Sequence, residues 1–195
     1  MSATLTAEPD LDALGAAASS LAVELGRVTV EVRGGGRRGA AATVSAGVVW
    51  HPDGLILTNA HVAHRDVTVV LADGRSWSAR LVARDPQRDL AALVVDASGL
   101  PAARIGDSGA LRVGELVLAV GNPLGLVRAL SAGLVHAVGP RAIHADLRLA
   151  PGNSGGPLAD ARGHVVGLNA MIVGGLAVAV PSRVARHFVR EQLRG

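Results

Sequence analysis

Three polar residues, far apart in the chain, have the types that an enzyme needs to turn a hydroxyl group into a nucleophile. His61 ends the segment Leu57-Thr-Asn-Ala-His61, Asp89 precedes an apolar run, and Ser154 stands in Pro151-Gly-Asn-Ser-Gly-Gly-Pro157. A neighbouring imidazole removes the proton of a serine hydroxyl, and a carboxylate on its other nitrogen fixes the tautomer and stabilises the cation. The order His, Asp, Ser occurs in known triads. The sequence therefore predicts a centre for acyl transfer.

The segment around Ser154 also predicts an oxyanion hole. The intermediate of acyl transfer carries negative charge on an oxygen atom, and backbone N–H groups stabilise this charge. Glycines let the backbone fold tightly around the serine. We therefore expect the loop Gly152-Asn153-Ser154 to form the oxyanion hole, with the N–H groups of Gly152 and Ser154 as donors.

Each of the three residues also has an ordinary structural interpretation. A histidine at a strand end is usually a surface or structural residue, and an aspartate such as Asp89 often caps a turn. The Gly-Asn-Ser-Gly-Gly-Pro segment is more specific than either. Its occurrence together with His61 and Asp89, in this order, favours the triad over three unrelated roles.

Short strands are expected to position these residues. Apolar runs separated by turn segments such as Pro52-Asp-Gly54 predict an all-β barrel or sandwich. Alternation at Val28, Val30 and Val32 predicts the first strand. The further runs are Val44–Trp50, Leu55–Thr58, Val67–Leu71, Ser76–Ala83, Leu90–Val95, Leu116–Val120, Ala129–Val138, His164–Met171 and Leu176–Val180.

A helix is expected at each end of this β region. Residues 1–10 are predicted to be a disordered tail, and Asp10 is a candidate cap for a helix that runs to about Gly26. The residues on its apolar stripe are Leu11, Leu14, Ala18, Leu21 and Leu25. Ser182 is a candidate cap for a closing helix, with Val184 and Phe188 facing inward.

The composition bounds the size of the core and its chemistry. The chain has 195 residues, which suits one domain or two half-domains with a shared core. Hydrophobic residues make up 49% and aromatic residues only 2%, so the core must consist of Val, Leu, Ile and Ala. Without cysteine, neither disulfides nor cysteine metal sites can form.

Nucleic acid, metals and cofactors are not expected ligands. The net charge is only +3, and the arginines are scattered among acids rather than clustered in a stripe with aromatic residues. His61 and His64 are three residues apart, but no third ligand completes a metal site. No cofactor motif is present, because the glycine-rich segment at residues 34–39 lacks the P-loop spacing and lysine.

No targeting or membrane segment is predicted. The first twelve residues carry acids without a basic region, and Ser19, Ser20 and Glu24 interrupt the apolar stretch that follows. This pattern is a poor signal peptide and too polar for a membrane span. As written, the sequence predicts a cytoplasmic protein, or an exported one if a leader was removed.

Several ordered motifs resemble the HtrA/Deg family of trypsin-like serine proteases. They extend over nearly the whole chain from about Arg27 to the closing helix, and so many ordered matches are very specific. The main ones are Asp53-Gly-Leu-Ile-Leu-Thr-Asn-Ala-His61-Val, Ala83-Arg-Asp-Pro-Gln-Arg-Asp89-Leu-Ala, Ala119-Val-Gly-Asn-Pro-Leu-Gly125, Pro151-Gly-Asn-Ser-Gly-Gly-Pro-Leu158 and Gly163-His-Val-Val-Gly-Leu-Asn169.

The resemblance implies two perpendicular six-stranded β-barrels with the active site in the cleft between them. Residues 11–195 would form a single protease domain. Its expected parts are an N-terminal barrel at about 27–105, a C-terminal barrel at about 110–181 and a closing helix at 182–193. The sequence ends at Gly195 without the PDZ domain that family members usually append.

The resemblance also places the specificity pocket. Its walls would be Leu149, Ala170, Met171, Ile172 and residues 176–178, all apolar, which implies small or medium aliphatic P1 residues. Arg148 lies six residues before Ser154, where trypsin-like enzymes place the base of this pocket. An inward Arg148 would favour an acidic P1 residue, whereas an outward one would pair with an acid such as Asp146. The alternation from Ala145 to Leu149 favours opposite faces.

The leading hypothesis is an ATP-independent serine endopeptidase that cleaves unfolded or damaged proteins. The alternatives are a chaperone-like module that binds extended peptides without cutting them, and a processing protease of narrow specificity. The family forms trimers, but the aromatic residues of its N-terminal trimer contacts are missing here, so the sequence does not predict the oligomeric state.

Overall fold

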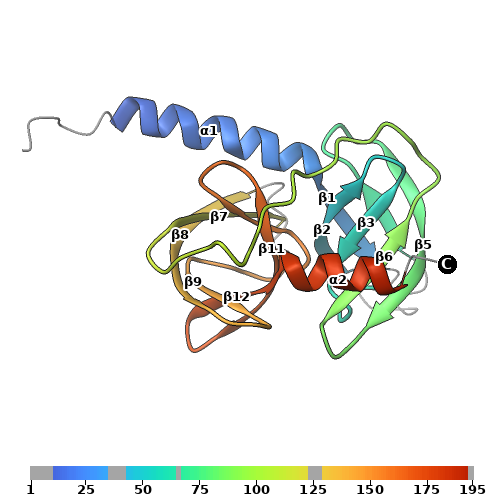
Figure 1. Cartoon of the computed structure of the whole chain (residues 1–195). Coiled ribbons are helices and arrows are strands. Elements are labelled where there is room, and N and C mark those ends of the chain that lie inside the picture. The colour runs from blue at the N-terminus through green and yellow to red at the C-terminus, as the bar shows by residue number, and fades with distance from the viewer. Residues whose placement is uncertain (1–10, 35–42, 65–66, 123–128, 193–195) are drawn as a thin grey trace, which may run out of the picture.

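The computed structural model describes residues 11–34, 43–64, 67–122 and 129–192. Within these ranges the chain forms two helices and twelve strands. The strands close into two barrels of six strands each, as the resemblance implied (Figure 1). The expected tail at 1–10 and the candidate cap Asp10 lie outside the described residues.

The first barrel has the strand order β1-β2-β3-β6-β5-β4, with antiparallel neighbours throughout. In β1, Val30 and Val32 are buried in the core while Arg33 is exposed, which is the predicted alternation. The buried core consists of Val, Leu, Ile and Ala side chains. The strands are β1 (Thr29–Gly34), β2 (Thr43–His51), β3 (Leu55–Thr58), β4 (Val67–Val70), β5 (Ser76–Asp85) and β6 (Leu90–Val94).

The second barrel has the order β10-β11-β12-β9-β8-β7. Two of its strands, β9 and β10, were not predicted. Both are only four residues long; polar His144 and Asp146 interrupt β9, and β10 begins at Pro157. The strands are β7 (Leu116–Gly121), β8 (Ala129–Val138), β9 (Ile143–Asp146), β10 (Pro157–Asp160), β11 (Val165–Val173) and β12 (Leu176–Pro181).

The N-terminal helix α1 (Leu11–Val28) runs along the second barrel and leads into the first (Figure 1). Leu25 is buried against Leu118 of β7, and Leu21 packs at the edge of the same cluster. The helix ends two residues later than predicted, where the Thr29 hydroxyl donates to the Leu25 carbonyl at 2.7 Å. Among the described residues, no helix has the length and apolarity of a membrane span.

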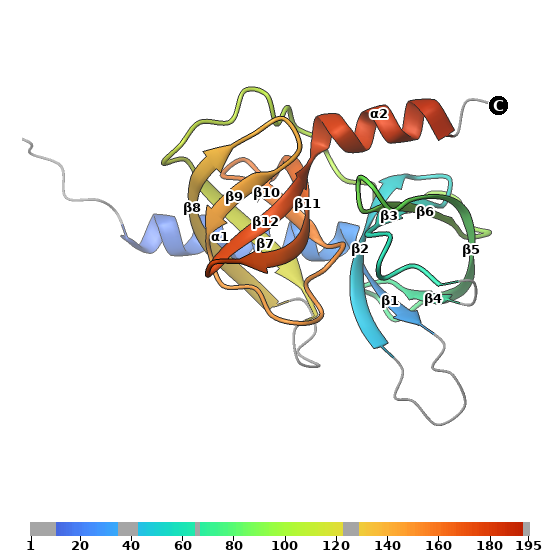
Figure 2. The ribbon, with the colours of Figure 1, turned by 90° about the horizontal axis from the view of Figure 1, so that it is seen from below.

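The C-terminal helix α2 (Ser182–Gln192) lies across both barrels (Figure 2). Ser182 is the first residue of the helix, but its hydroxyl does not form the predicted cap: it accepts from the Ser108 N–H at 3.2 Å and donates to the Gly106 carbonyl at 2.8 Å. Phe188 is completely buried between Leu57 of the first barrel and Leu168 of the second. The helix therefore fastens the two barrels to each other.

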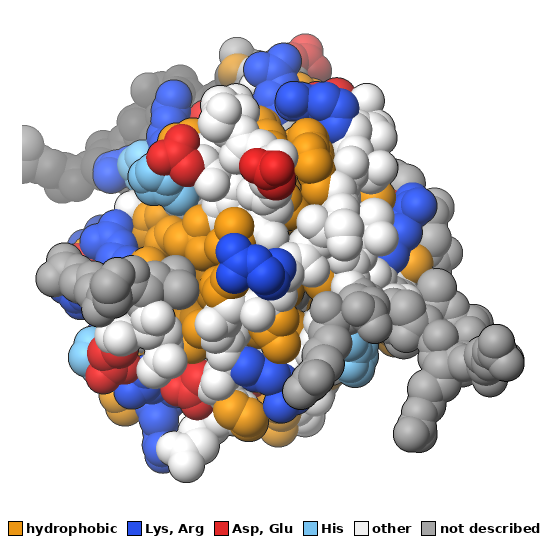
Figure 3. Space-filling view, turned by 90° about the vertical axis from the view of Figure 1, so that its right-hand side faces the viewer, with side chains coloured by type: hydrophobic (Ala, Val, Ile, Leu, Met, Phe, Trp, Pro, Cys, Tyr) orange, Lys and Arg blue, Asp and Glu red, His pale blue; other side chains and the backbone are white. Residues whose placement is uncertain are grey.

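Charged side chains pair locally on the surface. Arg33 contacts Glu31 and Arg75 contacts Asp73, each at 2.8 Å and exposed to solvent. On the end face in Figure 3, arginine, acidic and apolar side chains are interspersed. Exposed pairs of this kind contribute little to stability, so the apolar cores hold the fold together.

Candidate active site

His61 lies in a short turn directly after β3. The Asn59 carbonyl accepts hydrogen bonds from the N–H groups of Val62 and Ala63, both at 3.2 Å, and these bonds shape the turn. The guanidinium of Arg84 on β5 donates from Nε to the Ala60 carbonyl at 3.0 Å and thereby fixes the residue before His61. The imidazole is half exposed at the rim of the first barrel.

Asp89 lies directly before β6 and faces His61. Its Oδ2 and Oδ1 atoms are 2.9 and 3.0 Å from Nδ1 of His61, and the His61 N–H donates to Oδ1 at 3.1 Å. Its φ of 53° makes it the one non-glycine residue with a left-handed backbone among those described. Two bonds from backbone N–H groups to the Asp85 carboxylate shape the preceding turn. The predicted imidazole–carboxylate pair is therefore formed.

The loop that carries Ser154 is fixed to both barrels. The Ala46 N–H of β2 donates to the Ser154 carbonyl at 2.9 Å, and the Gly155 N–H donates to the Asn169 carbonyl of β11 at 2.8 Å. Gly155 has a φ of +83°, and a Cβ atom there would come within 2.2 Å of the Ala46 carbonyl and the Thr58 hydroxyl. This contact and the left-handed backbone together require glycine.

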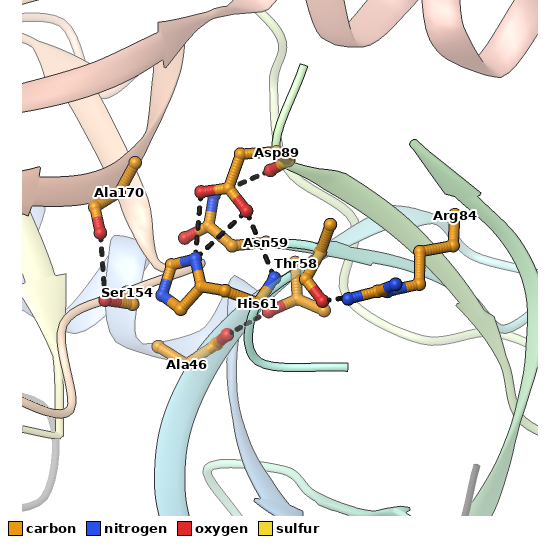
Figure 4. Close-up of polar contacts among 9 residues, drawn as sticks. Ala46, Thr58, Asn59, His61, Arg84, Asp89, Ser154 and Ala170 are labelled. Carbon is orange, nitrogen blue, oxygen red and sulfur yellow. Dashed lines mark hydrogen bonds and ion pairs between the residues drawn. The ribbon is translucent and has the colours of Figure 1, made fainter. Parts of the chain in front are cut away.

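The Ser154 hydroxyl lies beside His61 but is turned away from it. It donates to the Ala170 carbonyl at 3.1 Å, and no hydrogen bond joins Ser154 to His61, both of which the structure describes. Figure 4 shows the imidazole between Asp89 and Ser154. Because Nδ1 is engaged by the carboxylate, Nε2 is the ring nitrogen that remains for the serine.

Two backbone N–H groups near Ser154 are available as donors. Neither the Gly152 nor the Ser154 N–H has a hydrogen-bond partner among the described residues. The Gly152 carbonyl accepts from the Asn122 N–H at 3.1 Å. The Asn153 N–H donates to the Ala150 carbonyl at 3.0 Å. Asn153 was expected as part of this loop, and because its backbone N–H is engaged, the N–H groups of Gly152 and Ser154 remain the two candidate donors.

Three of the residues predicted for the specificity pocket line one cavity of about 650 Å³ in the second barrel. Arg148, Leu149 and Ile172 border it, together with Ser131 and Ala132 of β8, which sequence reasoning missed. No motif singles out such small residues in a strand. The cavity therefore has both polar and apolar walls.

The other predicted wall residues lie elsewhere. Ala170 is buried in the packing between the barrels, and Ala177 belongs to the core of the second barrel. Met171 is half exposed on β11, and neither it nor Ala170 borders this cavity. The predicted wall is therefore only partly brought together.

Arg148 is exposed, while Leu147 and Leu149 pack against the second-barrel core. The predicted opposite faces of this segment are therefore present. No ion pair joins Arg148 to Asp146, although both are described, so the expected outward pairing is absent. Arg148 presents its charge to solvent at the edge of the cavity. The described part of the chain has no cluster of three or more His, Asp or Glu side chains that could hold a metal ion.

Comparison with known proteins gives consistent matches. The trypsin-like peptidase domain family matches residues 45–168. A probable periplasmic serine endoprotease DegP-like of Ectopseudomonas mendocina (strain ymp) is 41% identical over 176 residues, 82% of this chain and 37% of that protein. A protein of the same name from Halomonas elongata is 39% identical over 168 residues, 78% of this chain and 35% of that protein.

Among solved structures, an HtrA-type protease AlgW with tripeptide superposes with a TM-score of 0.83 and 29% identity. The match covers 91% of this chain and 64% of that chain. The chain spans little more than a third of the length of the curated relatives it matches. Because these relatives are named periplasmic, they do not support the cytoplasmic location expected from the sequence as written.

Proposed function

Because the chain belongs to the trypsin-like serine peptidases of the HtrA/DegP type, we propose that it is a serine endopeptidase with His61, Asp89 and Ser154 as its catalytic residues. The imidazole–carboxylate pair, with Nδ1 of His61 2.9 Å from Oδ2 of Asp89, carries this proposal. The pair leaves Nε2 as the base for a hydroxyl that lies beside it.

The proposed reaction begins when Ser154 rotates from the Ala170 carbonyl towards His61. Nε2 takes the hydroxyl proton as the serine oxygen attacks the peptide carbonyl, and Asp89 stabilises the imidazolium. The N–H groups of Gly152 and Ser154 stabilise the oxyanion; one such donor is worth about 10²–10³ in rate. His61 then protonates the leaving amine, and water hydrolyses the acyl-enzyme by the same steps.

The proposed substrates are unfolded or damaged polypeptides, as the resemblance to HtrA proteases implies. The apolar side chains of Leu149 and Ile172 at the cavity support an aliphatic P1 residue. The names of the DegP-like relatives, which say periplasmic, support an exported protein. A role in protein quality control rests on the family resemblance. Assembly into a homo-oligomer also rests on the family resemblance.

Degradation of casein by the wild type and by Ser154→Ala tests the proposed function. We expect the wild type to degrade it and to react with a serine-directed phosphonate, and the variant to do neither, because removal of a triad residue typically costs about 10⁴–10⁶ in kcat. Equal activity of the two proteins would exclude Ser154 as the nucleophile.

A chaperone-like binding module is the second candidate. The hydrogen bond from Ser154 to Ala170, in place of one to His61, favours it because the nucleophile is not aligned. If wild type and Ser154→Ala are equally inert while both bind unfolded casein, this candidate replaces the first. Cleavage of only one or a few peptides by the wild type would instead indicate a processing protease.

A further inference from the structure

Asn59 is a buried polar residue next to the proposed triad, and it has no role in the proposed reaction. It follows β3 and lies two residues before His61, and its side chain is completely buried. Its Nδ2 donates to the backbone carbonyl of Asp89 at 3.0 Å (Figure 4). Its Oδ1 is buried and has no hydrogen-bond partner among the described residues.

The carboxylate of Asp89 has little else to orient it. Among the described residues it accepts hydrogen bonds only from His61, through the backbone N–H and through Nδ1. Its direction therefore depends on the conformation of its own backbone. That backbone is left-handed, with φ at 53°, a conformation that costs free energy for a residue with a side chain.

The amide of Asn59 stabilises this conformation. Apart from His61, it is the one side chain in the described ranges that forms a hydrogen bond with Asp89. Because it binds the carbonyl of Asp89, it fixes the peptide plane after the carboxylate and thereby the angle at which the side chain meets His61. The bond spans from the end of β3 to the start of β6, which are paired neighbours.

Only half of the Asn59 amide is used, and this argues for a specific purpose. A buried polar atom without a partner destabilises the fold, and an apolar side chain of similar size would remove that cost. For packing alone, leucine would therefore serve better. The donor that asparagine supplies is the one property that leucine lacks here.

We propose that Asn59 is a positioning residue that holds Asp89 at the angle at which its carboxylate orients His61. This inference rests on the proposed function, in which His61 is the base. Asn59 is buried and contacts neither the substrate nor the proton that passes from Ser154 to His61. It affects the reaction only through Asp89.

The test compares Asn59→Leu with Asn169→Leu. Asn169 is a matched control for the spectroscopic signal described below: it is also completely buried, its Nδ2 donates to the Pro157 carbonyl at 2.9 Å, and its Oδ1 likewise has no partner among the described residues. It is not a control for kcat, because its backbone carbonyl binds the Ser154 loop. On a chromogenic peptide with P1 Val, we expect Asn59→Leu to lower kcat by about 10–100-fold with little change in KM, because small misplacements of a catalytic group have effects of this size. Asn59→Ala serves if leucine does not fit.

A spectroscopic signal makes the test independent of activity. A proton on Nδ1 that is bonded to a carboxylate gives a low-field NMR signal, and His61→Gln identifies which signal belongs to His61. We expect Asn59→Leu to weaken this signal or move it upfield and Asn169→Leu to retain it. A wild type without protease activity would overturn the proposed function, whereas the signal would still decide the role of Asn59.

A double variant shows through which residue Asn59 acts. In an Asp89→Ala background, we expect Asn59→Leu to lower the remaining kcat by less than about twofold, since non-additivity marks residues that act as a unit. An unchanged kcat and an unchanged low-field signal in Asn59→Leu would overturn the inference. A full additional loss in the Asp89→Ala background would show that Asn59 has only a general structural role.

Discussion

Each barrel contributes half of the proposed active site, and only the half from the first barrel already has the geometry that the reaction needs. In the first barrel, three contacts within 3.1 Å join His61 to Asp89, so the base and the carboxylate that orients it are already in place. In the second barrel, the Ser154 backbone is firmly held, but its hydroxyl is bonded to the Ala170 carbonyl. The second half therefore still needs the Ser154 side chain to rotate away from the Ala170 carbonyl.

This difference shows where the barrier to activity lies. The bonds that fix His61 and Asp89 come from residues near them in the first barrel, such as Arg84 and Asn59. The Ser154 loop depends instead on contacts with both barrels. A rotation about one side-chain bond is fast, on the order of picoseconds to nanoseconds for exposed residues. Within the second half of the site, a change in the loop backbone should therefore affect activity more than this rotation does.

The largest expected effect is in the first barrel. Asp89→Asn should lower kcat by about 10⁴-fold, because an amide in place of the carboxylate selects the wrong tautomer of His61. Steady-state kinetics on a peptide substrate measure this, and thermal unfolding checks that the variant folds. A loss below tenfold would mean that the His61–Asp89 pair is not what prepares the base.

A substitution in the second half should have the next largest effect. Gly155→Ala places a Cβ atom within 2.2 Å of the Ala46 carbonyl, so the Ser154 loop must shift. We expect kcat to fall by at least about 10²-fold. The free energy of unfolding should fall by about 2–5 kcal/mol, because the left-handed backbone costs about 1–2 kcal/mol and the steric overlap about 1–3 kcal/mol more.

Gly174→Ala is the control for the left-handed backbone alone. Gly174 has a φ of +57°, but nothing lies within 4 Å of an added Cβ. We expect a cost of about 1–2 kcal/mol from the backbone conformation and a kcat close to that of the wild type. If both variants lose kcat equally, close packing against the first barrel does not hold the loop.

A substitution of Arg148 tests whether the second half of the site recognises the charge of an acidic P1 residue. The side chain is exposed and has no ion pair with Asp146, so an acidic P1 residue could gain only an exposed pair of about 0.2–1 kcal/mol. Arg148→Ala should lower kcat/KM for a P1 Glu peptide by about two- to fivefold and leave that for P1 Val unchanged. A tenfold or larger loss would place the guanidinium inside the pocket.

The smallest effect concerns the link from α2 to the turn before Asp89. A hydrogen bond from Arg88 holds the pKa of the Glu191 carboxyl below its usual value of 4.5, against the effect of burial. The stabilisation is therefore complete above that value and is lost as the pH falls through the lowered pKa of the folded state. Glu191→Gln should slightly lower Tm at neutral pH, and this difference should shrink as the pH falls below 4.5 and vanish once the wild-type carboxyl is protonated. A difference that persists there would have another origin.

Much of this arrangement could be predicted from the sequence, because apolar runs and turn residues mark strands such as Leu55–Thr58, which β3 matches residue for residue. The left-handed backbone of Asp89 and the direction of the Ser154 hydroxyl could not. Both depend on contacts between segments far apart in the chain. Asn59 was hidden for the same reason, since an asparagine after a strand resembles an ordinary turn residue.

The hydrogen bond from the Ala46 N–H to the Ser154 carbonyl has a consequence for the order in which the chain is synthesised and folds. Synthesis proceeds from the N-terminus, so the strand that carries Ala46 exists before the nucleophile, and the loop reaches its final shape only once the two barrels have docked. Before the two barrels dock, Ser154 is therefore not held next to His61. The proposed triad can therefore form only late, after the residues of both barrels have been synthesised.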